Sequence, residues 1–223
     1  MNKSDGPTLH RDDPDREPLL GHTKVTREDW LNVARDTLVR DGVAQVKILT
    51  LAERMQVSRS SFYWYFGNRD DLLKALLDEW EARNTAQIVQ QCGQRSQSIT
   101  EAALNFFRCF VDPARFDRGL DFAVREWSRR DEGLRARVDA ADATRLAAVT
   151  EMFLRHGFAP PDADARARIL YFMQLGYHAL DVREPIELRM SRLRPYLLGF
   201  TGEEPDEDAV AAFLSDVEAL GLR

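Results

Sequence analysis

A short segment, Ser58 to Phe66, holds the residues best suited to contact another molecule. Arg59 carries a planar guanidinium that can donate paired hydrogen bonds to guanine O6 and N7 or to a phosphate. Tyr63 and Tyr65 have hydroxyls that can donate to phosphate oxygens. Trp64 offers a large apolar ring suited to a thymine methyl. Exposed aromatic residues on so short a segment leave apolar surface in water, so they indicate a binding surface.

Two readings of these aromatic residues stay open at this point. Ser60 and Ser61 are small, so the backbone beside them can approach the surface of a partner closely. The same aromatic side chains could instead pack against a neighbouring helix, and Tyr65 is the residue for which this is the greater risk.

The segment needs supporting helices, because two short helices joined by a tight turn bury little apolar surface alone. A first helix begins at Thr26, where Thr26 and Asp29 can form a capping box, and it ends at Gly42. Its apolar positions follow a helical period and form one buried face: Trp30, Val33, Ala34, Thr37 and Leu38. A second helix is predicted over residues 48–55.

The segment itself is predicted to be a third helix, over residues 59–65. Ser58 caps it, and Phe62 and Phe66 point inward. Gly67 breaks this helix, and Asn68 caps a fourth helix that carries a leucine stripe.

Everything beyond Gly93 also has a helical pattern, and no run of alternating β-branched residues predicts a sheet. Pro and Gly residues divide this part into segments 98–111, 116–129, 134–156, 162–182, 187–197 and 206–220. The predicted fold class is therefore all-α. Residues 1–23, rich in Pro, Asp and Arg, are expected to be a flexible tail.

The distribution of charge favours a polyanion at one end of the protein. The chain has a formal net charge of −6, but residues 24–69 contain eight Lys and Arg against five Asp and Glu. A mildly basic head on an acidic body suits a protein that offers one end to nucleic acid. The sequence contains no 18-residue apolar run and no signal peptide, and its only cysteines are Cys92 and Cys109. We therefore expect a cytoplasmic protein without a membrane span.

The segment from Thr26 to Trp80 resembles the N-terminal domain of TetR-type (tetracycline-repressor-like) regulators. The resemblance is carried by Phe62-Tyr63-Trp64-Tyr65-Phe66, followed by a capped helix that opens Asn68-Arg69-Asp70-Asp71-Leu72-Leu73. It implies a helix-turn-helix DNA-binding domain over residues 24–70. A fourth helix would join this domain to a helical bundle over residues 71–223 that binds a ligand and forms a dimer. The DNA-binding residues that the resemblance implies are Lys24, Arg27, Lys47, Arg59, Ser60, Ser61, Tyr63, Trp64, Tyr65 and Arg69.

Two positions depart from the usual pattern of this family. Lys47 occupies the place of a capping Ser or Thr before the second helix, so about 1 kcal/mol of helix stabilisation is expected to be missing. Gln56 replaces a common Gly in the turn, and a left-handed backbone there would cost roughly 1 kcal/mol. Leu49 lies where some members of the family carry a base-reading Arg.

The body is rich in aromatic and methionine side chains, which line apolar pockets but also fill ordinary cores. The candidate pocket residues are Phe106, Phe110, Phe122, Trp127, Phe172, Met173, Tyr177 and His178. His178 and Asp181 are too few ligands for a metal site, so neither a metal nor a cofactor is expected. The cysteines are expected to be inert thiols. By the resemblance, segments 162–182 and 206–220 are the candidates for a dimer interface.

The function that these observations favour is a ligand-responsive transcriptional regulator, expected to be a repressor, that binds a palindromic operator as a homodimer. Its expected partners are double-stranded DNA and a small-molecule effector of unknown identity. An enzyme is not expected, since the sequence shows no phosphate-binding glycine loop, no Gly-x-Ser-x-Gly and no His-Glu-x-x-His. The alternative is a helical adaptor that binds another protein through Tyr63 and Trp64.

Overall fold

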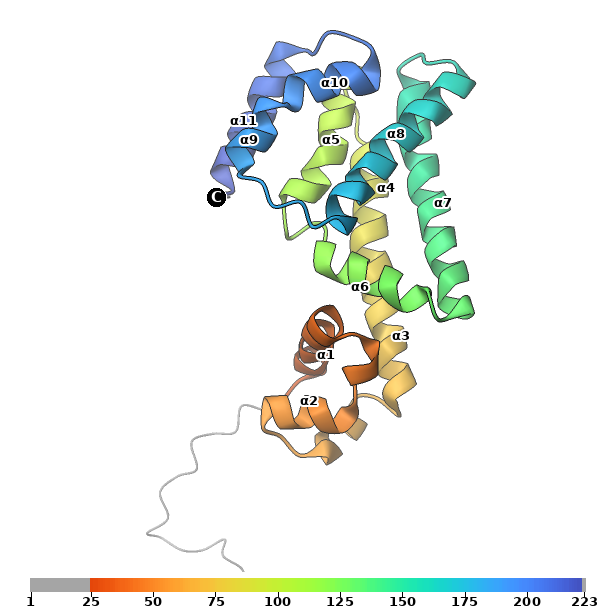
Figure 1. Ribbon diagram of the computed structural model, residues 1–223, viewed down its shortest axis with the longest axis vertical. Coiled ribbons are helices and arrows are strands. Elements are labelled where there is room, and N and C mark those ends of the chain that lie inside the picture. The colour runs from red at the N-terminus through yellow and green to blue at the C-terminus, as the bar shows by residue number, and fades with distance from the viewer. Residues whose placement is uncertain (1–24, 222–223) are drawn as a thin grey trace, which may run out of the picture.

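The computed structural model describes residues 25–221, and every regular element within that range is a helix (Figure 1). The predicted flexible tail and Lys24 lie outside the described residues. The elements are α1 (Arg27–Asp41), η2 (Val43–Gln45), α2 (Ile48–Met55), η3 (Arg59–Trp64), α3 (Arg69–Trp80), η4 (Glu81–Thr85), α4 (Ala86–Cys92), α5 (Ile99–Val111), α6 (Arg118–Ser128), α7 (Glu132–Arg155), α8 (Pro160–Ala179), α9 (Ile186–Ser191), α10 (Leu193–Thr201) and α11 (Glu207–Ala219).

The N-terminal helices form around two buried aromatic side chains. Trp30 of α1 and Phe62 of η3 are fully buried, and their ring centroids lie 5.2 Å apart in an edge-to-face arrangement. The predicted caps are present: Thr26 and Asp29 form a capping box, and the side chain of Asn68 accepts a hydrogen bond from the third residue of α3. These contacts fix the direction in which η3 presents its outer face.

The third element is a 3₁₀ helix, whereas the sequence predicted an α-helix over residues 59–65. Ser58 accepts a hydrogen bond from the amide of Ser60 at 3.2 Å, and Phe62 must reach Trp30. η3 has six residues, and only Phe62 among them is buried. So short a segment suits the tighter 3₁₀ geometry, because 3₁₀ helices are mostly short.

The fourth helix runs from Arg69 to Cys92 with a π-helical turn, η4, in its middle. In Figure 1 it leads from the N-terminal helices up into the body. Its first part, with Leu72 and Leu76, shares one core with Trp30, and that core continues into α6 and α7 through Val124 and Val138. The sequence-based boundary at residue 70 therefore falls inside a continuously packed region.

The body is a bundle of α4 to α11 with two further cores. One lies between α4, α5, α7 and α8 around Phe106 and Phe153, and the other joins α5, α10 and α11 around Phe213. The segment predicted as one helix over 187–197 is two helices, α9 and α10, that meet at Arg192. Pro195 explains the break, because it lacks the N–H that a continuous helix would direct at Ser191. Within residues 25–221, no helix is long and apolar enough to cross a membrane.

Candidate DNA-binding surface and effector pocket

The outer face of η3 is open to solvent. The side chains of Tyr63 and Trp64 are 59% and 70% exposed, and Arg59 is exposed at the start of the same element. Phe62 anchors the element from below, and its ring meets that of Tyr63 edge to face at 5.3 Å. Tyr63 and Trp64 are therefore supported by the core through Phe62, and among the described residues no other helix covers them.

The serine hydroxyls at the start of η3 are partly engaged within the turn. Ser58 Oγ lies 2.7 Å from Ser60 Oγ, and Ser61 Oγ donates to the backbone carbonyl of Ser58 at 2.7 Å. These hydrogen bonds hold the two serine side chains against the turn. The longer side chains of Arg59 and Trp64 therefore extend further into solvent than the serines do.

Tyr65 and Arg69 use their donors inside the protein. The Tyr65 hydroxyl donates to the carbonyl of Val25 at 2.7 Å, and the Arg69 guanidinium donates to the carbonyls of Val46 at 2.6 Å and Val43 at 2.7 Å. The carbonyl of Val43 also accepts from the amide of Val46 within η2, so Arg69 adds a second hydrogen bond there. These bonds fix the start of α1 and the turn before α2. The phosphate contacts expected of Tyr65 and Arg69 stay a prediction.

Two other expected phosphate contacts lie on the surface. Arg27 is exposed at the first position of α1, and its guanidinium stacks over the ring of Phe66 at 5.0 Å. Lys47 is exposed directly before α2 and makes no side-chain cap, as its type predicted. Leu49, 51% exposed in the first turn of α2, adds an apolar residue that the list of DNA-binding candidates did not include.

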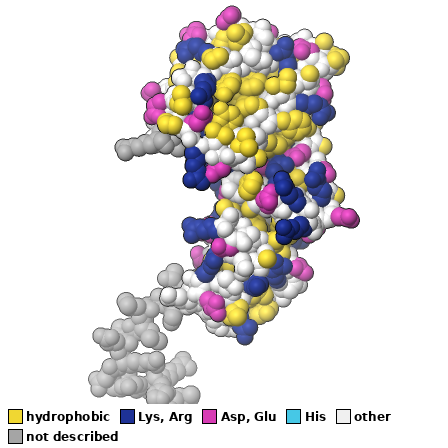
Figure 2. All heavy atoms as spheres, in the orientation of Figure 1, with side chains coloured by type: hydrophobic (Ala, Val, Ile, Leu, Met, Phe, Trp, Pro, Cys, Tyr) yellow, Lys and Arg dark blue, Asp and Glu magenta, His cyan; other side chains and the backbone are white. Residues whose placement is uncertain are grey.

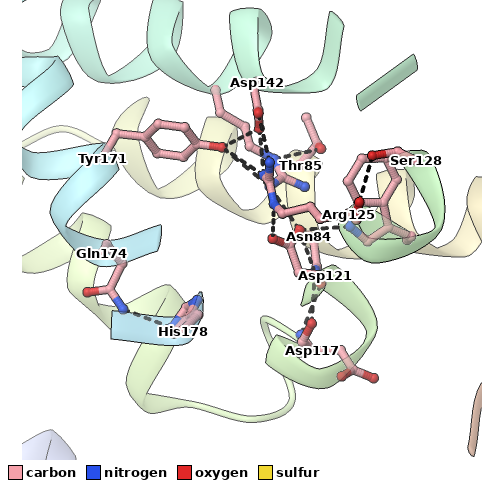
Figure 3. Close-up of polar contacts among 12 residues, drawn as sticks. Asn84, Thr85, Asp117, Asp121, Arg125, Ser128, Asp142, Tyr171, Gln174 and His178 are labelled. Atoms are coloured by element: carbon pink, nitrogen blue, oxygen red, sulfur yellow. Dashed lines mark hydrogen bonds and ion pairs between the residues drawn. The ribbon is translucent and has the colours of Figure 1, made fainter. Parts of the chain in front are cut away.

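A buried polar network joins the fourth helix to the body (Figure 3). Arg145 of α7 is fully buried and donates to Asp121 of α6 at 3.0 Å, and the same carboxylate oxygen accepts from the indole N–H of Trp80 at 2.8 Å. Arg125 pairs with the second oxygen of Asp121 at 2.8 Å and with Asp142 of α7 at 2.6 Å. The network therefore connects the end of α3 with both central helices of the body.

Two further residues extend this network. The Tyr171 hydroxyl of α8 donates to Asp142 at 2.6 Å, and Asn84 in the π-helical turn donates to the carbonyl of Asp117 at 3.0 Å. Burial alone would raise the pKa of Asp121, but the charges of Arg145 and Arg125 outweigh it and hold the pKa well below its usual range. The carboxylate is therefore ionised inside the protein.

An apolar pocket lies between α5, α8, α9, α10 and α11, with a cavity volume of about 60 Å³. Three of the predicted pocket residues line it: Phe110, Met173 and Tyr177. The other lining residues were not on the list of candidate pocket residues: Phe107, Val111, Gln174, Arg189, Met190, Leu193, Tyr196 and Phe213. Several of these lie on α9, α10 and α11, whose packing against α5 has no local signal in the sequence.

The remaining predicted pocket residues lie elsewhere. Phe106 is fully buried in the core, and Trp127 packs against the N-terminal core. Phe122 and Phe172 are 42% and 49% exposed, because their neighbours on α6 and α8 occupy the inward positions. His178 lines a wider neighbouring hollow instead, at the end of α8.

Both cysteines are buried as free thiols. Burial raises the pKa of Cys92 to about 12, and burial also raises the pKa of Cys109. Because the thiolate is the reactive form, both side chains behave as small apolar residues.

An exposed apolar face covers α8 and α10. It includes Ile169, Phe172 and Leu180, which are 56%, 49% and 78% exposed, and Leu198, which is 40% exposed. Figure 2 shows hydrophobic side chains gathered on the upper body, where Figure 1 places these two helices. The outward side of α11 is different, since it carries small and acidic residues such as Asp208 and Ala212.

Comparison with known proteins agrees with this architecture. The family model "Bacterial regulatory proteins, tetR family" matches residues 31–76. An HTH-type transcriptional regulator of Saccharopolyspora erythraea is 37% identical over 62 residues, covering 28% of this chain and 24% of that protein. The HTH-type transcriptional regulator BetI of Paraburkholderia phytofirmans is 28% identical over 94 residues, covering 40% of this chain and 48% of BetI. The matches thus span less than half the length of these relatives.

The whole fold has counterparts among solved structures. Salmonella enterica GusR superposes with a TM-score of 0.58 at 17% identity, covering 82% of this chain and 99% of GusR. The fold and the arrangement around η3 define a helix-turn-helix protein with an all-helical body. Residues 31–76 of the chain match the TetR family of bacterial regulatory proteins, and the two relatives align with 28% and 40% of the chain.

Proposed function

We propose that this protein is a transcriptional regulator that binds a palindromic operator as a homodimer and responds to a small-molecule effector. The observation that carries the proposal is the exposure of Tyr63 and Trp64 on the outer face of η3, beside Arg59. A helix in this position of a helix-turn-helix enters the major groove, where the bases differ most clearly. With this role we also propose a cytoplasmic location, where the DNA of a bacterial cell lies.

Dimerisation is supported by the apolar face of α8 and α10. A single η3 reads few base pairs, whereas two copies about 34 Å apart read successive major-groove faces. Covering Ile169, Phe172 and Leu198 with the same residues of a second copy would remove exposed apolar surface from water. We therefore assign the interface to α8 with α10, rather than to α8 with segment 206–220.

The response to an effector requires a connection between the body and η3. The buried network supplies this connection. Asp121 accepts a hydrogen bond from Trp80 at the end of α3, and Tyr171 of α8 joins the same network by donating to Asp142. α8 also lines the apolar pocket through Met173 and Tyr177. A ligand that shifts α8 would bias the spacing of the two η3 elements in the dimer. Weaker operator binding in the presence of ligand would make the protein a repressor that its effector releases.

The test is operator binding by a variant that keeps the fold. A duplex is first selected from random-sequence DNA with the full-length protein, and its affinity is measured by fluorescence anisotropy at fixed salt. Tyr63→Ala combined with Trp64→Ala is expected to weaken binding by about 100-fold, because each lost contact costs on the order of 1–3 kcal/mol. Leu220→Ala removes an exposed apolar side chain at the end of α11, outside the helix-turn-helix, and is the control.

Unchanged affinity in the double variant, with the control also unchanged, would remove the proposed recognition surface. The salt dependence separates the regulator from the protein-binding adaptor. Contacts between Arg59 or Lys47 and phosphates release counterions, so the affinity for duplex should fall steeply as salt increases. An adaptor would show no such binding of duplex.

A further inference from the structure

We propose that the effector is a small organic carboxylate whose anionic group pairs with Arg189 and Arg118 and whose apolar end enters the pocket beside Tyr177. The proposal rests on the regulatory function above and specifies the chemistry of its ligand.

The apolar end has a defined place. Phe107, Phe110, Met173 and Phe213 are among the apolar side chains around the cavity. Two of the polar groups in the wall satisfy each other, because the Tyr177 hydroxyl lies 3.0 Å from that of Tyr196. A buried space lined in this way favours an apolar group. At about 60 Å³ the cavity suits a small one, for which the flexible thioethers can make room.

The charged end faces two arginines without acidic partners. Arg189 lines both the apolar pocket and the wider hollow of about 680 Å³ beside it, and Arg118 lines that hollow from the start of α6. Among the described residues, neither guanidinium forms an ion pair or a hydrogen bond, and Arg189 lies only over the ring of Tyr177, at 4.8 Å. Most arginines of the body have carboxylate partners, as Arg125 does.

Each acidic group at this hollow has an arginine partner other than Arg189 and Arg118, although one buried oxygen of Glu184, Oε2, has no hydrogen-bond partner among the described residues. Asp181 accepts from Arg183 at 2.8 Å, and Glu184 accepts from Arg192 at 2.6 Å. Two unpaired positive charges therefore remain beside an apolar pocket.

The electrostatics at Arg189 agree with this geometry. Burial lowers the pKa of Arg189 and the nearby charge of Arg118 lowers it further, and together they outweigh the charge of Glu184, which raises it. His178 adds no charge, since burial lowers its pKa to about 4. A bound anion would relieve the repulsion between the two guanidiniums, and a carboxylate can accept two parallel hydrogen bonds from one of them. A cation would be repelled, and a neutral ligand would leave the half-buried Arg189 without a charged partner.

The two arginines also connect the ligand to the DNA-binding end. Arg189 belongs to α9, whereas Arg118 begins α6, the helix that packs against α1 and contributes Asp121 to the buried network. A carboxylate held by both would join α9 to α6. This link gives ligand binding a physical route to α1 and α3.

The experiment measures binding to the full-length protein by titration calorimetry, with benzoate and hexanoate as probes and benzamide and hexanamide as neutral matches. We expect the carboxylates to bind at least about tenfold more tightly than the amides, since charge-assisted pairs are the stronger ones. Arg189→Gln and, separately, Arg118→Gln should each weaken carboxylate binding by about tenfold or more. Arg183→Gln, at the same hollow but paired with Asp181, should leave it unchanged.

Equal binding of amides and carboxylates, retained affinity in Arg189→Gln, or no binding of either carboxylate would overturn the proposal. The proposed function is judged by a separate readout, the anisotropy of the selected duplex without any ligand. If the protein binds the duplex but not the carboxylates, the proposed ligand class is wrong and the proposed DNA-binding function is retained. If the duplex does not bind, the proposed function fails whatever the calorimetry shows.

Discussion

Replacing Asp121 by Asn removes the negative charge at the centre of the buried network while keeping the size of the side chain. Asp121 is 2% exposed and accepts from Trp80, Arg145 and Arg125 at 2.8, 3.0 and 2.8 Å. Arg145 is fully buried, and one of its terminal nitrogens has no partner among the described residues. The substitution would leave that guanidinium without its counter-charge, so we expect a loss of about 3–5 kcal/mol in the free energy of unfolding.

The assay is thermal and urea unfolding followed by circular dichroism. A loss of this size should lower Tm by roughly 6–20 °C in a chain of this length. Asp139→Asn is the matched control, because Asp139 pairs with Arg135 at 2.9 Å on the same helix as Arg145 but on its exposed side. An exposed pair of this kind contributes only about 0.3–0.5 kcal/mol.

The pH dependence gives a second readout. Because the folded pKa of Asp121 lies below its unfolded value of about 3.9, the stability from this group is fully present above that pH and is lost as pH falls through the folded pKa. The difference in stability between the wild type and Asp121→Asn should therefore be constant near neutrality and shrink below about pH 4. A stability of the variant equal to that of the Asp139→Asn control at pH 7 would refute the reasoning.

Three further predictions concern the helix-turn-helix and the thiols. Tyr65→Phe removes the hydrogen bond to Val25 and should lower the free energy of unfolding by about 1 kcal/mol in urea, with duplex affinity changed less than about threefold; a large loss of affinity instead would show Tyr65 to be a DNA contact. Gln56 has φ 56° in the turn after α2, so Gln56→Gly should stabilise by about 1 kcal/mol, and a lower urea midpoint would contradict this strain. Cys92 and Cys109 should resist a thiol reagent at pH 8 in the native protein and react in denaturant; rapid native labelling would contradict their burial.

The local features of the DNA-binding end could be predicted because each has a signal in a few adjacent residues. Thr26 with Asp29, Ser58 and Asn68 cap helices through their own side chains. The buried Trp30 and Phe62 each belong to an apolar pattern of helical spacing, Trp30 with Ala34 and Phe62 with Phe66. Such features depend on neighbours in the chain and on little else. The all-helical class follows in the same way from periodicity along the whole body.

The parts that could not be predicted depend on contacts between distant segments. Tyr65 and Arg69 have the residue types of phosphate contacts, yet their partners are carbonyls 23 to 40 residues away. The pocket could be predicted only in part, since Phe213 and Arg189 reach it through the packing of α9 and α11. Phe172 shows the same limit: an aromatic residue on α8 points inward or outward according to the rotation of the helix in the bundle.

The central claim is that the outer face of η3 enters the major groove, and dimethyl sulfate footprinting on the selected duplex tests it most directly, because guanine N7 is exposed in that groove. The account predicts two patches of protected guanine N7 about 10 base pairs apart, with protection lost in Arg59→Ala at the guanines that Arg59 contacts. A bound complex that leaves every guanine N7 as reactive as in free DNA would contradict it.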